Sequence, residues 1–286
     1  MNILSIQSWV AYGHVGNAAA VFPLQRLGAE VWAINTVQFS NHTGYGAWTG
    51  QVFDGAAVAA LVDGIGQRGA LARCDAVLSG YIGDAGIGGA ILEAVARVRA
   101  ENPAALYCCD PVIGDEGRGV FVRPGVPEML RDLVLPQADL ATPNQFELEW
   151  LTGGSCATLE DARAAVAALR ARMRPGPRAV LVTSLRTADT PGNSLDLLAV
   201  DDHGAFRIRS PLLPVSVNGA GDAIAALFLW HFARTDSAAT AAAAAASAVH
   251  GVLQRTAAVG SREILIVQAQ EEFVAPSLRL EAVRVG

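Results

Sequence analysis

A glycine-rich turn that ends in an acidic residue, Asn218-Gly219-Ala220-Gly221-Asp222, stands directly before an apolar run that extends to Phe232. In this run Ile224, Leu227 and Phe228 recur at the spacing of an amphipathic helix. The first N–H groups of a helix have no partner within the helix, and glycines let a ligand approach the backbone closely. The turn therefore predicts a site for an anion such as a phosphoryl group, with Asp222 beside it to accept a proton from a nucleophilic hydroxyl. The pentapeptide by itself is equally typical of a helix cap with an aspartate in the first turn.

Further carboxylates follow predicted strands. Asp110 comes directly after the apolar segment 106–109, and Asn144 and Glu147 flank the turn between a short strand and a helix. Mg²⁺ takes carboxylate oxygens together with waters and substrate phosphates, so we interpret Asp110 and Glu147 as a metal–nucleotide site. Each residue alone is more simply an exposed acid or, for Asn144, a helix N-cap, but together with the glycine turn they favour function. The five histidines show no metal-ligand spacing.

The segment 114–119 (GDEGRG) is rich in glycine and charge. It has the composition of a flexible lid over a phosphate, and Arg118 is its candidate contact to the anion. A surface loop without a role explains the same composition nearly as well.

Strands and helices alternate along the chain. Apolar segments predict strands at residues 2–8, 30–35, 75–79, 106–109, 140–141 and 179–183, and a hairpin at 196–200 and 205–209. Periodic segments predict helices at residues 17–27 (with Asn17 as N-cap), 56–66, 87–100, 145–151, 159–173, 219–233 and 237–254, whereas 36–50 is expected to be a loop. The alternation predicts an α/β fold with a mostly parallel sheet covered by helices on both faces. Ligands of such sheets bind beyond the carboxyl ends of the strands, where the polar residues named above would meet.

The composition excludes several classes of function. The chain has 286 residues, 52% hydrophobic and 17% charged, which suits one large α/β domain or two smaller ones and argues against disorder. The net charge of −6 is spread along the chain, so neither nucleic acid nor a membrane surface is an expected partner. Every basic residue is arginine, which excludes a Walker-motif lysine and a Schiff-base lysine.

The cysteines and the first residues indicate a cytoplasmic protein. Cys74, Cys108, Cys109 and Cys156 show no CxxC spacing, which favours buried, reduced thiols. The N-terminal segment lacks the basic residues of a signal peptide, and no apolar stretch approaches the ~20 residues that span a bilayer.

One segment is similar to a dinucleotide-binding motif. Residues 86–91 (GIGGAI) follow a strand and open a helix, and Asp110 lies at about the expected distance beyond them. The last position is Ile91, where close helix packing requires glycine or alanine. A dinucleotide oxidoreductase is therefore a distant alternative.

The turn Gly219–Asp222 resembles the hallmark of the ribokinase superfamily. Other segments, in order over most of the chain, resemble the pyridoxal kinases of that superfamily: Ser8 with 12–17 (YGHVGN), 35–43 (NTVQFSNHT), 79–81 (SGY), 109–112 (CDPV) and 143–149 (PNQFELE). The run VQFSNHT is specific to this branch. The resemblance implies a single ribokinase-like domain over residues 1–286, forming a homodimer. The resemblance further implies that this domain phosphorylates the 5′-hydroxymethyl group of pyridoxal, pyridoxine or pyridoxamine. MgATP would be the phosphoryl donor, and the reaction would belong to the salvage of pyridoxal 5′-phosphate.

The resemblance also implies roles for individual residues. Asp222 would be the base, and the N–H groups of Gly219, Ala220 and Gly221 would bind the γ-phosphoryl group. The vitamer would contact Ser8, Thr43, Gly44, Tyr81 and Asp222. ATP would contact Asp110, Thr142, Asn144, Glu147, Thr183 and Arg209, with Mg²⁺ at Asp110 and Glu147. K⁺ is a further candidate cofactor.

The chain also departs from the family pattern. Gly44 stands where a polar side chain is common, which leaves the vitamer preference open, and Thr183 stands where relatives often carry lysine, which leaves the ATP affinity open. Trp9, Thr142 and Asn218 are also unusual at their positions. Two alternatives remain: a hydroxymethylpyrimidine kinase of the same fold, and a vitamer-binding protein with weak catalysis.

Overall fold

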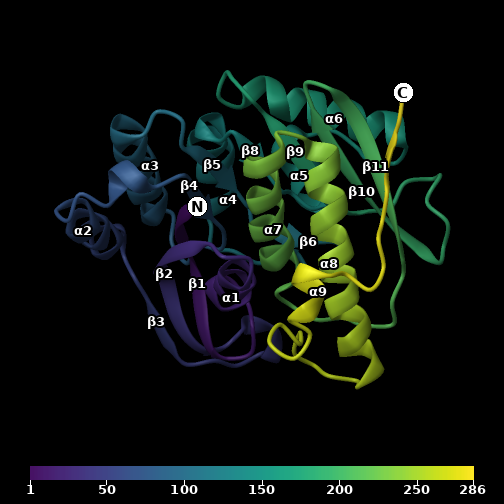
Figure 1. Cartoon of the computed structure of the whole chain (residues 1–286), viewed down its shortest axis with the longest axis horizontal. Coiled ribbons are helices and arrows are strands. Elements are labelled where there is room, and N and C mark those ends of the chain that lie inside the picture. The colour runs from purple at the N-terminus through teal and green to yellow at the C-terminus, as the bar shows by residue number, and fades with distance from the viewer.

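One ten-stranded sheet runs through the computed structural model, which describes residues 1–286 (Figure 1). Its strands are β1 (Asn2–Tyr12), β2 (Glu30–Asn41), β3 (Gly50–Val52), β4 (Ala76–Ser79), β5 (Leu106–Cys109), β8 (Leu140–Ala141), β9 (Ala179–Leu185), β10 (Ser194–Asp201), β11 (Gly204–Pro211) and β12 (Ala282–Arg284). They lie in the order β12-β11-β10-β9-β8-β5-β4-β1-β2-β3. A separate hairpin joins β6 (Gly114–Asp115) to β7 (Gly119–Val120).

The six central strands are parallel. β2, β1, β4, β5, β8 and β9 pair in the same direction, and antiparallel strands extend the sheet at both ends. The middle strands β4, β5 and β8 are mostly apolar, as sequences of buried parallel strands are, and all four residues of β4 are buried. The predicted α/β fold with a mostly parallel sheet is therefore confirmed, and the carboxyl ends of six strands meet along one edge.

Helices cover both faces of the sheet, and each face has its own apolar core. On one face lie α2 (Gly55–Gly66), α3 (Gly86–Glu101), α4 (Val126–Met129), α5 (Gln145–Thr152) and α6 (Leu159–Arg172). On the other lie α1 (Asn17–Arg26), α7 (Ala220–Thr235), α8 (Ala238–Ala258) and α9 (Glu271–Val274), which face the viewer in Figure 1. The alanine run 241–246 of α8 packs against this second core. Small side chains there let α7 and α8 approach each other and the sheet.

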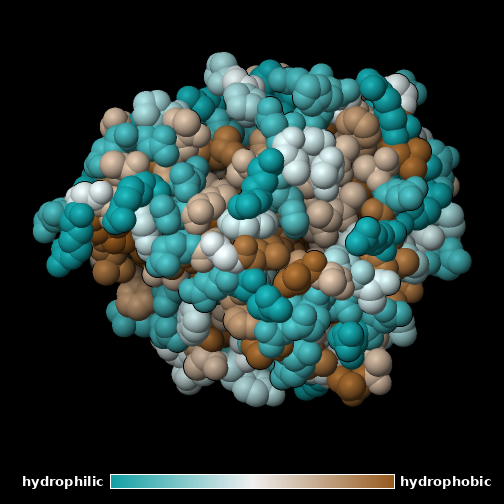
Figure 2. All heavy atoms as spheres, viewed as in Figure 1, coloured by the Kyte–Doolittle hydropathy of each residue, from teal (hydrophilic) through white to brown (hydrophobic).

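The outer surface over α1, α7 and α8 is mixed in character. Figure 2 shows hydrophobic side chains on this face in small groups, separated by hydrophilic ones. None of the helices combines the length and the apolar character needed to cross a membrane.

β2 is longer than the sequence predicts. Residues 36–41 continue the strand instead of forming a loop, and only Thr43–Tyr45 forms a 3₁₀ turn. Val37 and Phe39 alternate toward the interior, while the backbone pairs with β1 on one side and β3 on the other. The expected loop was wrong because polar residues on the second face of this edge hid the two-residue period.

Asn17 does not cap α1, contrary to the prediction. Gly16 holds the N-cap position with a φ of +55°, and Asn17 is fully buried. Its side-chain oxygen accepts a hydrogen bond from Ser5 Oγ (2.7 Å), and its amide nitrogen donates to the carbonyl of Ile34 (3.0 Å). The side chain of Asn17 thus joins β1 to β2 beneath the edge of the sheet where the carboxyl ends of the parallel strands meet.

Gly88, within residues 86–91, serves helix packing. Residues 86–91 open α3, and a Cβ at Gly88 would lie 2.1 Å from the sulfur of Met129. Close contact with the segment around α4 thus accounts for the glycine that resembled a dinucleotide motif.

Candidate active site

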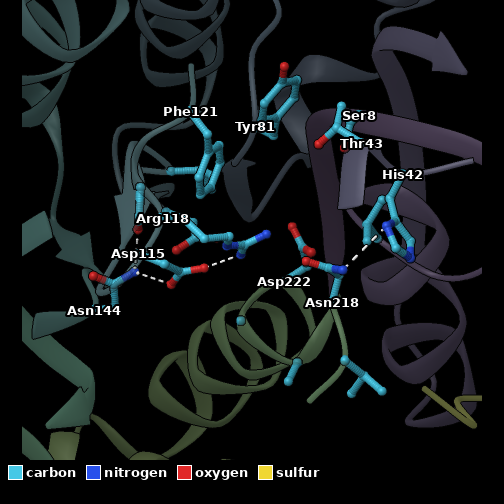
Figure 3. Close-up of a pocket in the computed structure, with 18 of the residues that line it drawn as sticks. Ser8, His42, Thr43, Tyr81, Asp115, Arg118, Phe121, Asn144, Asn218 and Asp222 are labelled. Carbon is cyan, nitrogen blue, oxygen red and sulfur yellow. Dashed lines mark hydrogen bonds and ion pairs between the residues drawn. The ribbon is translucent and has the colours of Figure 1, made fainter. Parts of the chain in front are cut away.

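A cavity of about 270 Å³ lies where the carboxyl ends of the parallel strands meet the N-terminus of α7 (Figure 3). Most residues predicted from the sequence line it: Ser8, Thr43, Tyr81, Asp110, Thr142, Asn144, Glu147, Thr183 and the turn Gly219–Asp222. In Figure 3, Ser8 and Thr43 lie on one side and Arg118 and Asn144 on the other, with Asp222 between them. Segments that are distant in sequence thus form one site.

The turn before α7 presents free N–H groups to this cavity. Gly219 has a φ of +94°, and a Cβ there would lie 2.0 Å from the carbonyl oxygen of His14, so the position requires glycine. The bond from Ala223 N to the Gly219 carbonyl (3.0 Å) starts the helix, which leaves the preceding N–H groups without intrahelical acceptors. A Cβ at Gly221 would meet no protein atom within 4 Å. This arrangement fits a phosphoryl group bound by the backbone.

Asp110 and Asp222 face the same cavity without a basic partner. Burial, and after it the charge of Asp222, raise the pKa of Asp110 to about 7. A hydrogen bond from Thr142 Oγ1 to Asp110 Oδ1 (2.8 Å) opposes this rise. Burial likewise raises the pKa of Asp222, against hydrogen bonds from the N–H groups of Gly16 and of Asp222 itself. Carboxyl groups with such raised pKa values in a cavity are typical of catalytic sites.

Glu147 is buried and accepts three backbone N–H groups. Its Oε1 accepts from Ile113 (2.8 Å) and Gly114 (3.4 Å), and its Oε2 accepts from Asn144 (2.9 Å). Burial, and after it the charge of Asp110, raise the pKa of Glu147 well above its usual value, and the N–H groups oppose this rise. Both oxygens are thus already engaged by the protein.

Asn144 and Glu147 hold the β6–β7 hairpin. Asn144 caps α5 by accepting from the Glu147 N–H (2.8 Å), as the sequence indicated. Its amide nitrogen donates to the Gly114 carbonyl (2.8 Å) and to Asp115 Oδ1 (3.2 Å). The segment predicted as a flexible loop is therefore a short hairpin anchored at its base. Arg118 pairs with Asp115 and lines the cavity.

The donor set of this edge fits a Mg²⁺ ion bound mainly through a substrate. No group of three or more His, Cys, Asp or Glu residues forms a metal cage. Asp110, Glu147 and Asp222 nevertheless bring three acidic side chains to one cavity, and no arginine pairs with any of them. Mg²⁺ typically takes one or two carboxylates and completes its shell with waters and phosphates. Asp110 is the better candidate ligand, because the oxygens of Glu147 already accept N–H groups.

Apolar side chains line the part of the cavity near Ser8 and Tyr81. Four residues to which the sequence assigned no role in the site lie there: Val10, Val37, Phe39 and Phe121. Tyr81 is half-buried, and Thr36 Oγ1 donates to its carbonyl (2.7 Å). An apolar wall with a few hydroxyl groups suits a flat aromatic ring with polar substituents.

A second, mostly apolar cavity of about 180 Å³ adjoins the turn Gly219–Asp222 (the anion turn). It shares Thr183, Ser184, Ala220 and Gly221 with the first cavity. Its other walls are mainly aliphatic, with one polar pair in which Ser210 Oγ lies 2.9 Å from His250 Nδ1. Ser184 has a φ of +53°, a backbone strain that sequence patterns do not reveal.

Two predicted residues lie outside the main cavity. Arg209 is on β11, where its guanidinium is held by both carboxylate oxygens of Asp196 (2.7 Å each) and by the Asp189 carbonyl (3.0 Å). It lines none of the cavities described here. Gly44 lines an adjoining cavity of about 660 Å³.

Two residues that line the site, and one beside it, had no role predicted from the sequence. His42 and Asn218 line the main cavity, and the ring nitrogen Nδ1 of His42 lies 3.3 Å from the Asn218 amide. Glu263, on the C-terminal segment, contacts the other ring nitrogen at 3.0 Å. The seven-residue run containing His42 drew attention to its neighbours, but nothing in the sequence pointed to Glu263.

Comparison of the sequence with known proteins finds kinases. Residues 66–268 match the family model described as phosphomethylpyrimidine kinase. The chain is 68% identical to a pyridoxal kinase of Granulibacter bethesdensis over 278 residues, covering 97% of each chain. It is 58% identical to a pyridoxal kinase of Deinococcus radiodurans, covering 99% of this chain and 96% of that one.

Comparison with solved structures also finds pyridoxal kinases. A pyridoxal kinase from Leishmania donovani in complex with ADP and pyridoxamine superposes with a TM-score of 0.90 at 31% identity, covering 100% of this chain and 99% of the other. The same enzyme with ADP and pyridoxine gives the same TM-score and identity.

Proposed function

The chain belongs to the pyridoxal kinase family, and from this premise we propose that its main cavity carries out ATP-dependent phosphorylation of the 5′-hydroxymethyl group of a vitamin B6 vitamer. One observation carries the proposal. The free N–H groups before α7 and the Asp222 carboxylate face one cavity, which has an apolar wall for an aromatic ring. An anion site, a base and a ring-binding wall are what a hydroxymethyl kinase requires.

Asp222 would act as the base. Its carboxylate would accept the proton of the 5′-hydroxyl as that oxygen forms a bond to the γ-phosphorus of ATP and the bond to the β-phosphate oxygen breaks. The N–H groups of Ala220 and Gly221 would stabilise the charge on the transferred group, because they are fixed at the N-terminus of a 16-residue helix. Asp222 must be ionised for this step, so its raised pKa makes the reaction sensitive to acid.

The apolar cavity beside Gly221 suits the adenine of ATP. It adjoins the anion turn, so a nucleotide with its base there would direct its phosphates toward Asp222. Thr183 lines both cavities and can donate a hydroxyl hydrogen bond, though not the positive charge of a lysine. Arg209 is excluded from our proposal for this nucleotide, because Asp196 and Asp189 occupy its guanidinium.

Mg²⁺ would be held by Asp110 and the nucleotide phosphates, with Glu147 adding negative charge nearby. When bound, the ion neutralises charge on the phosphates. Asp110 contributes a carboxylate, and Thr142 fixes that carboxylate by its hydrogen bond of 2.8 Å. K⁺ remains a further candidate, tested by its effect on turnover.

The vitamer would lie against the apolar wall. Ser8 and Thr43 would hydrogen-bond the polar atoms of the pyridine ring, and Tyr81 would pack against its face. Gly44 borders the adjoining cavity and would give room at the ring's edge.

Hydroxymethylpyrimidine phosphorylation is the second candidate, because the matching family model is described as phosphomethylpyrimidine kinase. The test is ATP turnover with pyridoxal, pyridoxine, pyridoxamine and hydroxymethylpyrimidine, with and without Mg²⁺, with products identified by mass spectrometry. Mg²⁺-dependent formation of a vitamer 5′-phosphate supports the first proposal. Turnover of the pyrimidine alone assigns the second, and tight vitamer binding without turnover assigns a binding protein.

The proposal also covers the domain organisation, the oligomeric state and the cellular location of the protein. One continuous sheet from Asn2 to Arg284 supports a single domain over residues 1–286. A homodimer and a cytoplasmic location rest on the family resemblance; sedimentation analysis and cell fractionation test them.

A further inference from the structure

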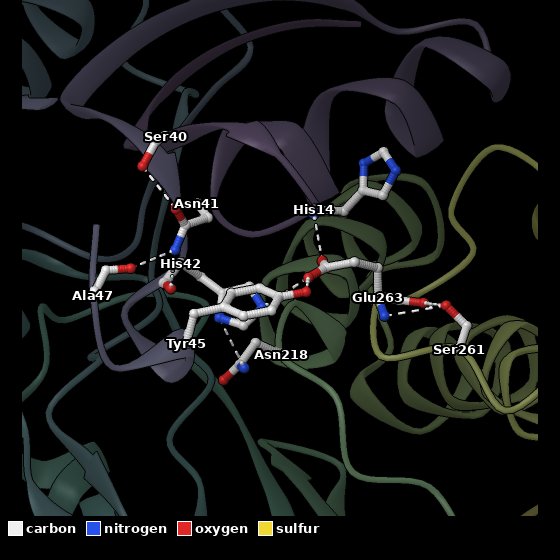
Figure 4. A network of polar contacts seen from close by, with 9 residues as sticks. All are labelled: His14, Ser40, Asn41, His42, Tyr45, Ala47, Asn218, Ser261 and Glu263. Atoms are coloured by element: carbon white, nitrogen blue, oxygen red, sulfur yellow. Dashed lines mark hydrogen bonds and ion pairs between the residues drawn. The ribbon is translucent and has the colours of Figure 1, made fainter. Parts of the chain in front are cut away.

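Glu263 joins three segments around the main cavity (Figure 4). Its Oε1 accepts hydrogen bonds from Tyr45 Oη (2.6 Å) and from His42 Nε2 (3.0 Å). Its Oε2 accepts from the His14 N–H (3.3 Å). In Figure 4 the rings of Tyr45 and His42 lie one over the other and both point to this carboxylate, with centroids 4.7 Å apart. One side chain thus fixes the 3₁₀ turn after β2 and the turn before α1.

The position of Glu263 is itself fixed. Ser261 Oγ donates to the Glu263 carbonyl (2.6 Å) and accepts from its N–H (3.1 Å). A Cβ at Gly13 would lie 2.1 Å from Glu263 Oε2, so the carboxylate occupies space that only a glycine leaves free. The side chains of Glu263 and His42 are only 14% and 11% exposed, so their interaction is shielded from water.

The contact continues from His42 to the anion turn. A carboxylate only accepts hydrogen bonds, so Nε2 of His42 donates to Glu263 and Nδ1 is left to accept from the Asn218 amide (3.3 Å). A Cβ at Gly44 would lie 2.9 Å from that amide nitrogen and 3.0 Å from Nδ1, so glycine at position 44 leaves room for this contact. Asn218 directly precedes Gly219, the N-cap of α7.

We propose that Glu263 is a positioning residue for the vitamer: through His42 it holds residues 42–45 and Asn218 together, and so sets the wall of the cavity formed by Thr43. The inference rests on the proposed function only in taking the vitamer as the ligand of this cavity. Glu263 does not line the main cavity or the apolar cavity, so its effect reaches the vitamer through His42. The hydrogen bond that Tyr45 donates to Glu263 also raises the pKa of Tyr45 to about 12.

Steady-state kinetics of Glu263→Ala and Glu263→Gln test this proposal, with pyridoxal and ATP varied separately. We expect Glu263→Ala to raise KM for pyridoxal by about tenfold, the size of effect expected for a lost hydrogen bond to a charged group. KM for ATP should change less than about twofold on the same scale, because the apolar cavity lies away from Glu263. Glu263→Gln keeps a carbonyl oxygen for His42 and Tyr45 and should recover part of the loss.

The matched control is Glu271→Ala, which removes an exposed carboxylate of the same C-terminal segment and its ion pair with Arg26 (3.2 Å). It should leave both KM values unchanged. A double-mutant cycle with Glu263→Gln and Asn218→Ala adds an independent readout, because residues coupled through His42 should give non-additive changes in kcat/KM. Since Gln preserves the shape of the side chain, the cycle remains informative even if Glu263→Ala folds poorly.

The outcomes separate this inference from the proposed function. If the wild-type protein fails to turn over pyridoxal, the proposed function fails, and calorimetric titration with pyridoxal then compares the same variants by Kd. Equal vitamer affinity in wild type, Glu263→Ala and Glu263→Gln would overturn the positioning role. Equal losses toward ATP and vitamer would also overturn it, because they would indicate a general effect on the fold.

Discussion

Thr142 donates its hydroxyl to Asp110 Oδ1 over 2.8 Å, at the ends of two adjacent parallel strands. Both side chains are buried, with 3% and 6% exposure, so the bond lies in a region of low dielectric constant. It stabilises the ionised carboxylate and opposes the burial and the Asp222 charge that together raise the pKa of Asp110 to about 7. Thr142, unusual in the family pattern, thus helps to keep Asp110 ionised near neutral pH.

Thr142→Val tests this relationship. Valine has nearly the same shape as threonine but cannot donate, so the pKa of Asp110 should rise above its present value of about 7. We expect the acidic limb of the kcat/KM profile for ATP to move to higher pH. Thr142→Ser, which keeps the hydroxyl, is the control and should leave the limb near its original position. An unmoved limb in the valine variant would show that Asp110 does not govern it.

Asp110→Asn should stabilise the folded protein at alkaline pH while reducing turnover. A carboxyl group with a higher pKa in the folded state binds its proton more tightly there, so its contribution to stability falls as pH rises from about 4 to about 7. Removing the charge should therefore raise the free energy of unfolding at pH 8 by on the order of 1–4 kcal/mol, with a much smaller gain at pH 5. Urea denaturation at both pH values measures this difference.

The control for this variant is Asp63→Asn, which removes an exposed carboxylate paired with Arg97. It should change stability by less than about 1 kcal/mol and alike at the two pH values. If the free energy of unfolding of Asp110→Asn changed no more than that of this control, the buried charge of Asp110 would not destabilise the folded state.

Much of the fold could be predicted because local patterns and tertiary structure agree. β5 and β8 have the predicted bounds, and most other predicted elements differ by a few residues, but the short elements β3, β6, β7, β12, α4 and α9 were not predicted. The extension of β2 over residues 36–41 and the role of Asn17 were missed because their environment comes from neighbouring strands. In the sequence, an asparagine such as Asn17 that bonds to β1 and β2 cannot be distinguished from an asparagine that caps a helix.

The residues of the candidate site also fall into two groups, those that could be predicted from the sequence and those that could not. Residues directly after strands, such as Asp110, could be predicted, since the topology gathers strand ends along one edge. Glu263 could not, because 221 residues separate it from His42 and no local pattern encodes their contact. Gly44 and Asn218, two unrelated departures in the sequence, lie side by side in the structure, where the missing side chain of one makes room for the other.

Glu147→Ala should release the β6–β7 hairpin. The buried N–H group of Ile113 and the partly buried N–H group of Asn144 would lose their acceptor, which costs about 1–3 kcal/mol for each group left unsatisfied in the interior. We expect lower stability and faster hydrogen exchange at residues 113–120, measured by mass spectrometry. Glu149→Ala on the same helix, whose carboxylate accepts from Cys156 N instead, is the control and should leave this hairpin protected. Unchanged exchange after Glu147→Ala would contradict the anchoring role.

Asp222→Asn should reduce kcat by about 10²–10⁴-fold, the usual contribution of a general base. The fold should survive, because burial already disfavours the charge of this carboxylate. Asp236→Asn at the other end of α7 is the control, since asparagine tolerates the φ of +48° found there. Single-turnover measurements with pyridoxal would detect the effect on the chemical step. A kcat near that of the wild type would remove Asp222 as the base.

The two glycines of the anion turn should respond differently to substitution. Gly219→Ala introduces a Cβ 2.0 Å from the His14 carbonyl at a φ of +94°, so it should lower the thermal midpoint by several degrees. Gly221→Val meets no protein atom within 4 Å of its Cβ, so the protein should fold, but the side chain would occupy space that both cavities share. We therefore expect Gly221→Val to lose ATP turnover at a near-normal thermal midpoint, with Gly221→Ala intermediate. Scanning calorimetry and turnover assays on the three variants separate these effects. Normal turnover in Gly221→Val would show that the phosphoryl group does not approach the backbone at this turn.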